Sequence, residues 1–292
     1  MLSKAINIIP FYSAEQCIWL RSVVDAYDRL SDRYIEDDDM ITFDDSIDVQ
    51  NVKPFHLVTL ACLIQCLAKM GHNVYISPNN KHLADYLFND LGFQEYFGGG
   101  KNYVETKTSS NIFNLWRIVE TDKDMYAMNV ENYFRSRYFH DKDLSAISLC
   151  MVEAYYNVFD HAVAMGNAFS IIQYDEASSR LYVAISDFGI GVAQSVRRVN
   201  SNVNSDSEAI SLAIKDGFTV SSTEKNRGMG LGNIFNMTDE VMLISNGGMI
   251  SKKCDNSLET ADLKFRYPGT LISFEIDLSL MDDEEIIEEF NI

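Results

Sequence analysis

The chain has 292 residues, enough for two domains of ordinary size, and it is 47% hydrophobic and 23% charged, a balance typical of globular proteins. Its formal net charge is −19, from 43 acidic and 24 basic side chains, so its surface repels phosphate backbones. No run approaches the ~20 apolar residues of a membrane helix, and the N-terminus lacks the pattern of a secretion signal. We therefore expect a cytoplasmic protein that contacts neither nucleic acid nor membrane.

Residues 1–97 alternate segments typical of strands with segments typical of helices. Short apolar runs predict strands at residues 5–11, 40–49 and 72–77. Apolar residues at helical spacing predict helices at residues 14–34, 54–71 and 80–92. Pro54 near the start and Gly71 at the end of the second helix agree with these bounds. Strands separated by helices indicate an α/β unit with a largely parallel sheet.

Three consecutive glycines at 98–100 interrupt this alternation and predict a domain boundary. About 25 less regular residues follow, and a second α/β region runs from about Met125 to Leu280. We therefore expect an α/β domain with its linker over 1–108, a second domain over 109–281 and an acidic tail over 282–292. The tail either docks on a basic partner or is solvated.

Two of the five cysteines, Cys62 and Cys66, lie four residues apart on one face of the second predicted helix. This spacing is compatible with half of a metal site or with cysteines that pack as small apolar residues. No second pair of ligands follows at a spacing typical of zinc sites, which favours packing.

Residues 151–162, MVEAYYNVFDHA, combine polar and apolar side chains in one helical stretch. At 3.6 residues per turn, four polar side chains fall within about one-quarter of the helix circumference. They are Glu153, Asn157, Asp160 and His161. The apolar side chains that we expect to pack are Val152, Tyr156, Val158 and Phe159. Such a polar stripe suits either a helix that lines a ligand cavity or an amphipathic surface helix.

A glycine-rich stretch follows an alternating strand, RLYVAIS, at 180–186. The strand leads into Asp187, Gly189 and Gly191. An acid at a strand end can accept a hydrogen bond from an amino group such as that of adenine. Glycines allow the following backbone to approach a ligand closely or to adopt a positive φ.

A second glycine-rich stretch, NRGMGLGNI at 226–234, opens a predicted helix. Gly228, Gly230 and Gly232 place backbone N–H groups at a helix N-terminus, which is a geometry that binds phosphate. The spacing excludes the dinucleotide-binding pattern G-x-G-x-x-G, because residue 233 is asparagine. The signatures of P-loops and protein-kinase loops are also missing.

The order of these motifs resembles that of the GHKL ATPase superfamily, which includes DNA gyrase, heat-shock chaperones, histidine kinases, mismatch-repair ATPases and anti-sigma-factor kinases. E-x-x-x-N on a helix is followed by D-x-G-x-G after a strand, by G-x-G-x-G opening a helix, and by Gly269-Thr270 in YPGTLISFEIDL. The similarity covers roughly residues 125–280. It implies a two-layer α/β sandwich, in which helices cover one face of a mixed sheet, and it implies ATP and Mg²⁺ as ligands.

The resemblance also implies roles for individual residues. In the family, the asparagine of the first motif coordinates Mg²⁺ and the glutamate activates water for attack on the γ-phosphate, which corresponds to Asn157 and Glu153. Asp187 corresponds to the residue that recognises the adenine amino group, and Thr270 to one that supports the adenine pocket. Residues that correspond to nucleoside and phosphate contacts are Gly189, Gly191, Gly228, Gly230, Leu231 and Gly232.

Other residues of this region have two interpretations each. Residues 192–227 are similar to the family's mobile lid, which orders on nucleotide binding. Lys225 and Arg227 either meet the γ-phosphate or are solvated lid charges. Asp160 and His161 either line the ribose or phosphate region or form a structural pair.

Within the superfamily, compact domains resembling the anti-sigma-factor kinases fit best. His140 lies too close to Glu153 to be a separate phosphoacceptor, and no receiver or transducer domain is visible. Residues 1–108 look like a STAS-type domain of anti-sigma antagonists. The phosphorylated serine or threonine of that family is replaced by NVKPFHL at 51–57, and Thr59 lies inside the helix, so a protein-binding role is favoured.

Three functions are compatible with these residues. The chain is a regulatory ATPase whose slow hydrolysis is coupled to lid closure and partner binding, a serine/threonine kinase of the anti-sigma type, or a non-hydrolysing ATP-gated interaction module. We expect ATP or ADP and a regulatory protein as partners, and a homodimer is compatible with the sequence.

Overall fold

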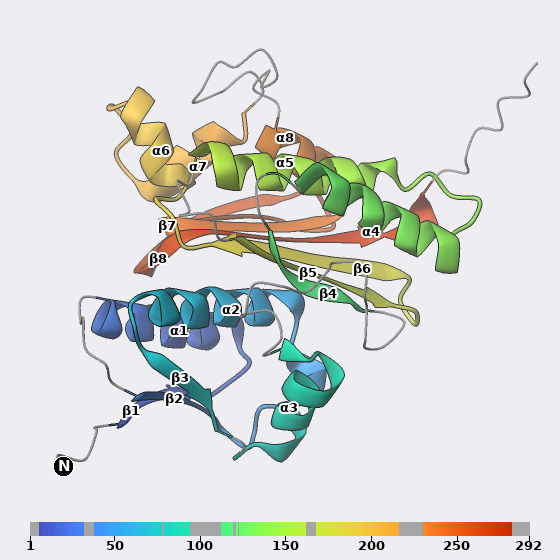
Figure 1. The fold of residues 1–292 in the computed structure, drawn as a ribbon. Helices are drawn as coiled ribbons and strands as arrows, with labels where there is room; N and C mark the ends of the chain where they lie inside the picture. Colours follow the sequence, from blue (N-terminus) through green and yellow to red (C-terminus); the bar gives the residue numbers. More distant parts are fainter. Residues whose placement is uncertain are drawn as a thin grey trace, which may run out of the picture.

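The computed structural model describes residues 6–31, 38–77, 79–93, 112–118, 121, 123–161, 168–215 and 230–281 (Figure 1). These residues form a mixed α/β fold with a three-stranded and a five-stranded sheet. No helix within these ranges is both long and apolar enough to cross a membrane.

The three-stranded sheet is parallel, in the order β1-β2-β3, as the alternating sequence pattern predicts. Its strands are β1 (Ile6–Phe11), β2 (Asp38–Phe43) and β3 (Asn73–Ile76). Its helices are α1 (Gln16–Leu30), α2 (Pro54–Lys69) and α3 (Lys81–Asp85), the last of which continues as a π-helical turn over Tyr86–Asp90. We call residues 6–93 the N-terminal unit.

Local sequence sets the bounds of the two long helices of this unit. The Glu15 carboxylate accepts hydrogen bonds from the N–H groups of Cys17 and Ile18, both at 3.1 Å, at the start of α1. Pro54 occupies the first turn of α2, where its missing N–H costs nothing, and Gly71 follows the end of α2 with a φ of 91°. Both crossovers advance across the sheet in the same direction, which puts both helices on one face (Figure 1).

The five-stranded sheet has the order β4-β5-β6-β8-β7, and all four strand pairs are antiparallel. Its strands are β4 (Ile112–Ile118), β5 (Ala168–Asp175), β6 (Arg180–Asp187), β7 (Glu240–Lys252) and β8 (Leu258–Asp277). The expectation of a mixed sheet is therefore wrong for the described strands. Short turns join β5 to β6 and β7 to β8, and a short turn can only join antiparallel neighbours. Strand β4 is not predicted from the sequence, because its segment follows the glycine run and has no regular apolar pattern.

Five helices cover one face of this sheet (Figure 1). They are α4 (Lys123–Arg137), α5 (Ser145–His161), α6 (Val192–Val199), α7 (Asp206–Ala213) and α8 (Gly230–Met237). The buried side of α5 consists of Ile147, Cys150, Met151, Ala154 and Tyr155. The prediction that Val152 packs is confirmed, because this half-buried side chain lies against the core, whereas the half-buried ring of Tyr156 faces the Lys123 ammonium. The side chains of Val158 and Phe159 lie outside the described residues. At 100° per residue, Tyr155 lies opposite the polar stripe, with Met151 and Val152 on either side of it.

The other face of the five-stranded sheet is covered by α1 and α2 of the N-terminal unit (Figure 1). Side chains on this outer face form one apolar core with both helices, namely Phe169, Ile171, Ala184, Ile244 and Leu271. The expectation that helices cover only one face is therefore wrong. The predicted boundary at residue 108 lies outside the described residues, but the segments on either side of it share a hydrophobic core.

This shared core predicts that the two sheets unfold together. Leu271→Ala is expected to lower the free energy of unfolding by about 2–5 kcal/mol, because it leaves a cavity between β8 and the N-terminal unit. Urea denaturation followed by tryptophan fluorescence, to which Trp19 of α1 contributes, and by far-ultraviolet circular dichroism should give one coincident transition.

The matched control is Leu280→Ala, since this side chain is 73% exposed and its loss should cost no more than about 0.5 kcal/mol. Two separated transitions, or equal losses for the two variants, would contradict a shared core.

Candidate functional site

The residues predicted to recognise adenine lie together at one end of the central strands of the five-stranded sheet. Asp187, the last residue of β6, is in register with Thr270 of β8, and Thr270 is in register with Ser245 of β7. Ala168 of β5 flanks Asp187 on its other side. Since side chains alternate along a strand, these positions face the side of the sheet that α5 and α8 cover.

Asp187 is the most unusual group in this row. Its side chain is fully buried, and neither carboxylate oxygen has a hydrogen-bond partner among the described residues. Burial raises its pKa well above the ordinary value for aspartate. The N–H groups of Gly189 and Thr270 lie close enough to oppose this shift, but neither meets the geometry of a hydrogen bond. A buried acceptor without a donor is costly, and a ligand with an N–H group would satisfy it.

Two glycines bring the backbone after Asp187 tightly against β8. Gly191 has a φ of 81°, and a Cβ atom there would lie 2.6 Å from the Ser245 hydroxyl. Gly269 has a φ of 138°, and its Cβ would lie 2.2 Å from the carbonyl oxygen of Asp187. Only glycine fits either position. The close approach that the sequence predicts is thus present between segments of the chain itself, and a ligand contact at Gly189 or Gly191 stays a prediction.

Side chains that the sequence analysis missed hold this loop in place. Asn246, with a φ of 53°, donates to the Ile190 carbonyl at 3.1 Å and accepts from the Gln194 N–H at 3.2 Å. The Val192 N–H donates to the Thr270 hydroxyl at 3.3 Å, so Thr270 also contacts the loop. The sequence feature that points to the role of Asn246 is S-N-G-G at 245–248, because asparagine and glycine within an apolar run mark an irregular strand.

The predicted catalytic pair lies on α5, which packs against both α8 and β6. The side chains of Glu153 and Asn157 are half-buried, and burial raises the pKa of Glu153. The Asn157 amide donates to the Glu153 carbonyl at 2.8 Å, which directs its N–H group to the helix and leaves its side-chain oxygen to accept. Asp160 and His161 occupy the last turn of α5, and their side chains lie outside the described residues.

The structure describes only part of the second glycine-rich stretch, residues 226–234. Helix α8 begins at Gly230, so Gly230 and Gly232 lie in its first turn rather than before it. Leu231 is buried and packs in the core. Lys225, Arg227 and Gly228 lie outside the described residues, so their predicted phosphate contacts stay predictions.

The first part of the predicted lid is folded into α6 and α7, which belong to the core of the domain. The Asp206 carboxylate, at the start of α7, forms ion pairs with Arg197 and Arg266 and accepts from the Gly247 N–H at 2.8 Å. These contacts tie α6 and α7 to β7 and β8. The expectation of a lid over 192–227 is therefore wrong for 192–215, because the apolar faces of these helices are buried, and residues 216–229 lie outside the described part of the chain.

Cys62 packs in the hydrophobic core, as the packing interpretation predicts, and Cys66 is half-buried. Cys62 is buried, and its thiol donates to the Ser186 carbonyl at 3.4 Å. Burial raises the pKa of both the Cys62 and the Cys66 thiol, so both are held in the protonated form. In the ranges that the structure describes, no three His, Cys, Asp or Glu side chains form a group that could hold a metal ion.

Two comparisons with known proteins find no match for this chain. No model of a known protein family matches it, and a search of curated proteins finds no match. Any function assigned to this chain therefore rests on its residues and their geometry.

The buried carboxyl of Asp187 predicts a specific dependence of stability on pH. Unfolded aspartate has a pKa of about 3.9, and the folded value is higher, so the folded state holds one extra proton between the two values. In that window, the free energy of unfolding of the ligand-free protein should fall by up to about 1.4 kcal/mol per pH unit as pH rises. Urea denaturation of the wild type and of Asp187→Asn, which cannot titrate, isolates this contribution as a difference.

Asp175→Asn is the control, since Asp175 ends the neighbouring strand β5 and is only half-buried. Hydrogen bonds from Ser178 and Ala177 lower the pKa of Asp175, so its contribution should have the opposite sign. A difference between wild type and Asp187→Asn that does not change with pH would show that the Asp187 carboxyl is not perturbed.

Proposed function

We propose that this chain is a regulatory ATPase that binds ATP with Mg²⁺ and hydrolyses it slowly. The observation that carries the proposal is the fully buried Asp187 carboxyl, which has no hydrogen-bond partner in the described structure and lies in register with Thr270 at the end of β6. The exocyclic amino group of adenine is a donor of the kind this carboxyl lacks. The close backbone contacts at Gly191 and Gly269 fix the end of β6 relative to β8.

The Asp187 carboxyl would favour adenine over guanine. Adenine presents an amino group at the position where guanine presents a carbonyl oxygen. A carboxylate opposite a carbonyl pairs two acceptors, so a guanine base would leave Asp187 buried and unsatisfied. A site built to accept a hydrogen bond discriminates strongly against a ligand that cannot donate one.

Helix α5 supplies the groups for the triphosphate. Asn157 would hold a Mg²⁺ ion, which would supply positive charge to offset that of the phosphates. The side-chain oxygen of Asn157 is a hard neutral ligand that suits this ion. Glu153 lies one turn before Asn157, and burial brings its pKa closer to neutral pH, where a general base is most effective. Backbone N–H groups in the first turn of α8 would contact the phosphates.

Nucleotide binding is tested first with Asp187→Asn. The amide replaces one of the two acceptor oxygens with a donor, so we expect the Kd for ATP with Mg²⁺ to rise about 10- to 100-fold, which corresponds to the loss of a hydrogen bond to a charged group. Isothermal titration calorimetry measures this change, with ADP and GTP as further ligands.

The control for this experiment is again Asp175→Asn, which should bind ATP as the wild type does. An absence of ATP binding by the wild type, or equal affinities for ATP and GTP, would remove the basis of the proposal.

Hydrolysis is tested separately with Glu153→Gln. We expect phosphate release to fall at least about 100-fold while ATP affinity changes less than about threefold, because the amide cannot take a proton from water. Glu131→Gln is the matched control, since Glu131 lies on α4, pairs with Arg135 and has no part in the proposed site.

The same assay separates the other functions. Equal phosphate release from wild type and Glu153→Gln would refute the role of Glu153. Transfer of labelled γ-phosphate to a protein encoded nearby, in place of release, would identify a protein kinase. Tight ATP binding without release or transfer would identify a non-hydrolysing switch.

A further inference from the structure

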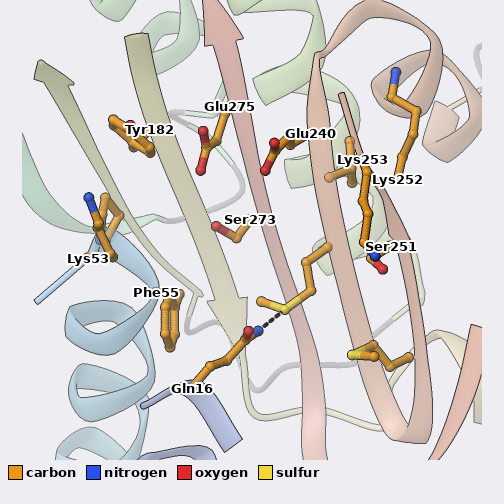
Figure 2. Close-up of a pocket in the computed structure, with 14 residues that line it drawn as sticks. Gln16, Lys53, Phe55, Tyr182, Glu240, Ser251, Lys252, Lys253, Ser273 and Glu275 are labelled. Atoms are coloured by element: carbon orange, nitrogen blue, oxygen red, sulfur yellow. Dashed lines mark hydrogen bonds between the residues drawn. The ribbon is translucent and has the colours of Figure 1, made fainter. Parts of the chain in front are cut away.

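A second polar site lies at the junction between the N-terminal unit and the five-stranded sheet. It is a cavity of about 310 Å³, within the range of small-molecule pockets (Figure 2). One wall is formed by the starts of α1 and α2, with Gln16, Lys53 and Phe55. The opposite wall is the outer face of the sheet, so this cavity and the Asp187 carboxyl lie on opposite faces.

The sheet wall of the cavity is a single row of side chains. Tyr182 of β6 is in register with Glu275 of β8, and Glu275 is in register with Glu240 of β7. Figure 2 shows these three residues side by side, with Ser273 next to Glu275 and with Lys53 beside Tyr182. The row therefore has a cation at one end and carboxylates in the middle and at the other end.

The third wall forms because β7 bends back on itself. Its register slips at Asn246, which has a positive φ, and beyond this point the Cys254 thiol comes within 2.7 Å of the Glu240 carboxylate. Met242 before the bend and Met249 after it both line the cavity. The bend thus gives the cavity an apolar lining next to its charges.

The two carboxylates of the row differ in their partners. Glu275 forms an ion pair with Arg180 at 3.3 Å. Burial, and then the charge of Glu240, raise the pKa of Glu275. Glu240 accepts from the Cys254 thiol but forms no ion pair with any residue that the structure describes. Like charges directly opposite on paired strands destabilise each other, so a cation at Glu240 would stabilise this wall.

The cation at the other end of the row is exposed, and its charge acts on the Glu275 and Asp175 carboxylates. The Lys53 ammonium lies over the ring of Tyr182, 4.7 Å from its centroid, and makes no ion pair within the described ranges. A cation–π contact of this kind leaves the ammonium free to bind an anionic group. Glu275 lies between Lys53 and Glu240 in the row, so these two charges do not neutralise each other directly.

We propose that this cavity binds a small zwitterion of amino-acid or dipeptide size. Its anionic group is held by Lys53, its ammonium group by Glu240, and its apolar part by Phe55, Met242 and Met249. Each of these two charges can pair with an opposite charge on the ligand, and the cavity between them suits a molecule of this size. This inference does not depend on the proposed nucleotide site.

Other ligand classes fit less well. A divalent cation would need more ligands than the cavity provides, since no three acidic, histidine or cysteine side chains in the described chain form a metal group. A nucleotide or other polyanion would meet the carboxylates of Glu240 and Glu275 at close range. A purely apolar ligand would leave Lys53 and Glu240 unpaired.

The experiment uses the full chain and two probe sets, the proteinogenic amino acids and glycine-containing dipeptides. Each compound is added singly at about 5 mM, and a thermal shift identifies binders that calorimetry then quantifies. We expect at least one compound to bind, and its Kd to rise about tenfold or more in Lys53→Met and in Glu240→Gln. The amine and the acid that correspond to the best binder, each lacking one charge, should both bind at least about tenfold more weakly.

Two variants serve as controls, Lys81→Met at the start of α3 and Glu131→Gln on the opposite face of the sheet, and both should bind as the wild type does. The proposal is overturned if no probe shifts the melting temperature, if the two cavity variants retain wild-type affinity, or if the single-charge analogues bind as well as the zwitterion. Because neither ATP nor Mg²⁺ is present, failure here leaves the proposed nucleotide site unaffected.

Discussion

The rest of the structure depends on the burial of α1 and α2 between two sheets. A parallel sheet needs helices to cover it, and the five-stranded antiparallel sheet has a second apolar face that also has to be covered. One pair of helices does both, because α2 is apolar nearly all the way round, with Leu57, Leu60, Ala61 and Leu63 all buried. A helix that is apolar on every side is stable only when it is enclosed. The two halves of the chain therefore form one continuous layered body.

This arrangement places the N-terminal unit directly behind the proposed adenine site. Alternation along β6 sends Asp187 to one face and its neighbours Ser186 and Phe188 to the other. The Ser186 hydroxyl lies 2.6 Å from the Tyr267 hydroxyl, and the Phe188 ring packs edge-on against both Tyr27 of α1 and Tyr267. Contacts with the N-terminal unit thus support the strand end that carries the buried carboxyl. A change in the packing of α1 would therefore reach Asp187 through the end of β6.

Two rows of polar side chains interrupt the otherwise apolar faces of the central strands. At one end, Asp187, Thr270 and Ser245 face α5, and at the other, Tyr182, Glu275 and Glu240 face the start of α2. Both rows cross β6, β8 and β7. The first contains a carboxyl without a hydrogen-bond partner in the described structure, the second contains two facing carboxylates, and each lies where two elements distant in sequence meet. In a fold whose other faces are packed, such groups are retained at a cost in stability, which is typical of binding sites.

Sequence alone determined the elements of the N-terminal unit, since apolar spacing, Pro54 and Gly71 act locally, and it brought Asp187 and Thr270 into one hypothesis through motif order. It did not determine which faces are covered. The antiparallel pairing, β4, the helices at 192–213 and the packing of α1 and α2 on the second sheet all depend on contacts between residues far apart in the chain. The junction cavity depends on a bend at Asn246 and on a register that pairs Glu240 with Glu275 across 35 residues. Local sequence carries no signal for either, because the free energy that selects them comes from burial of both faces at once.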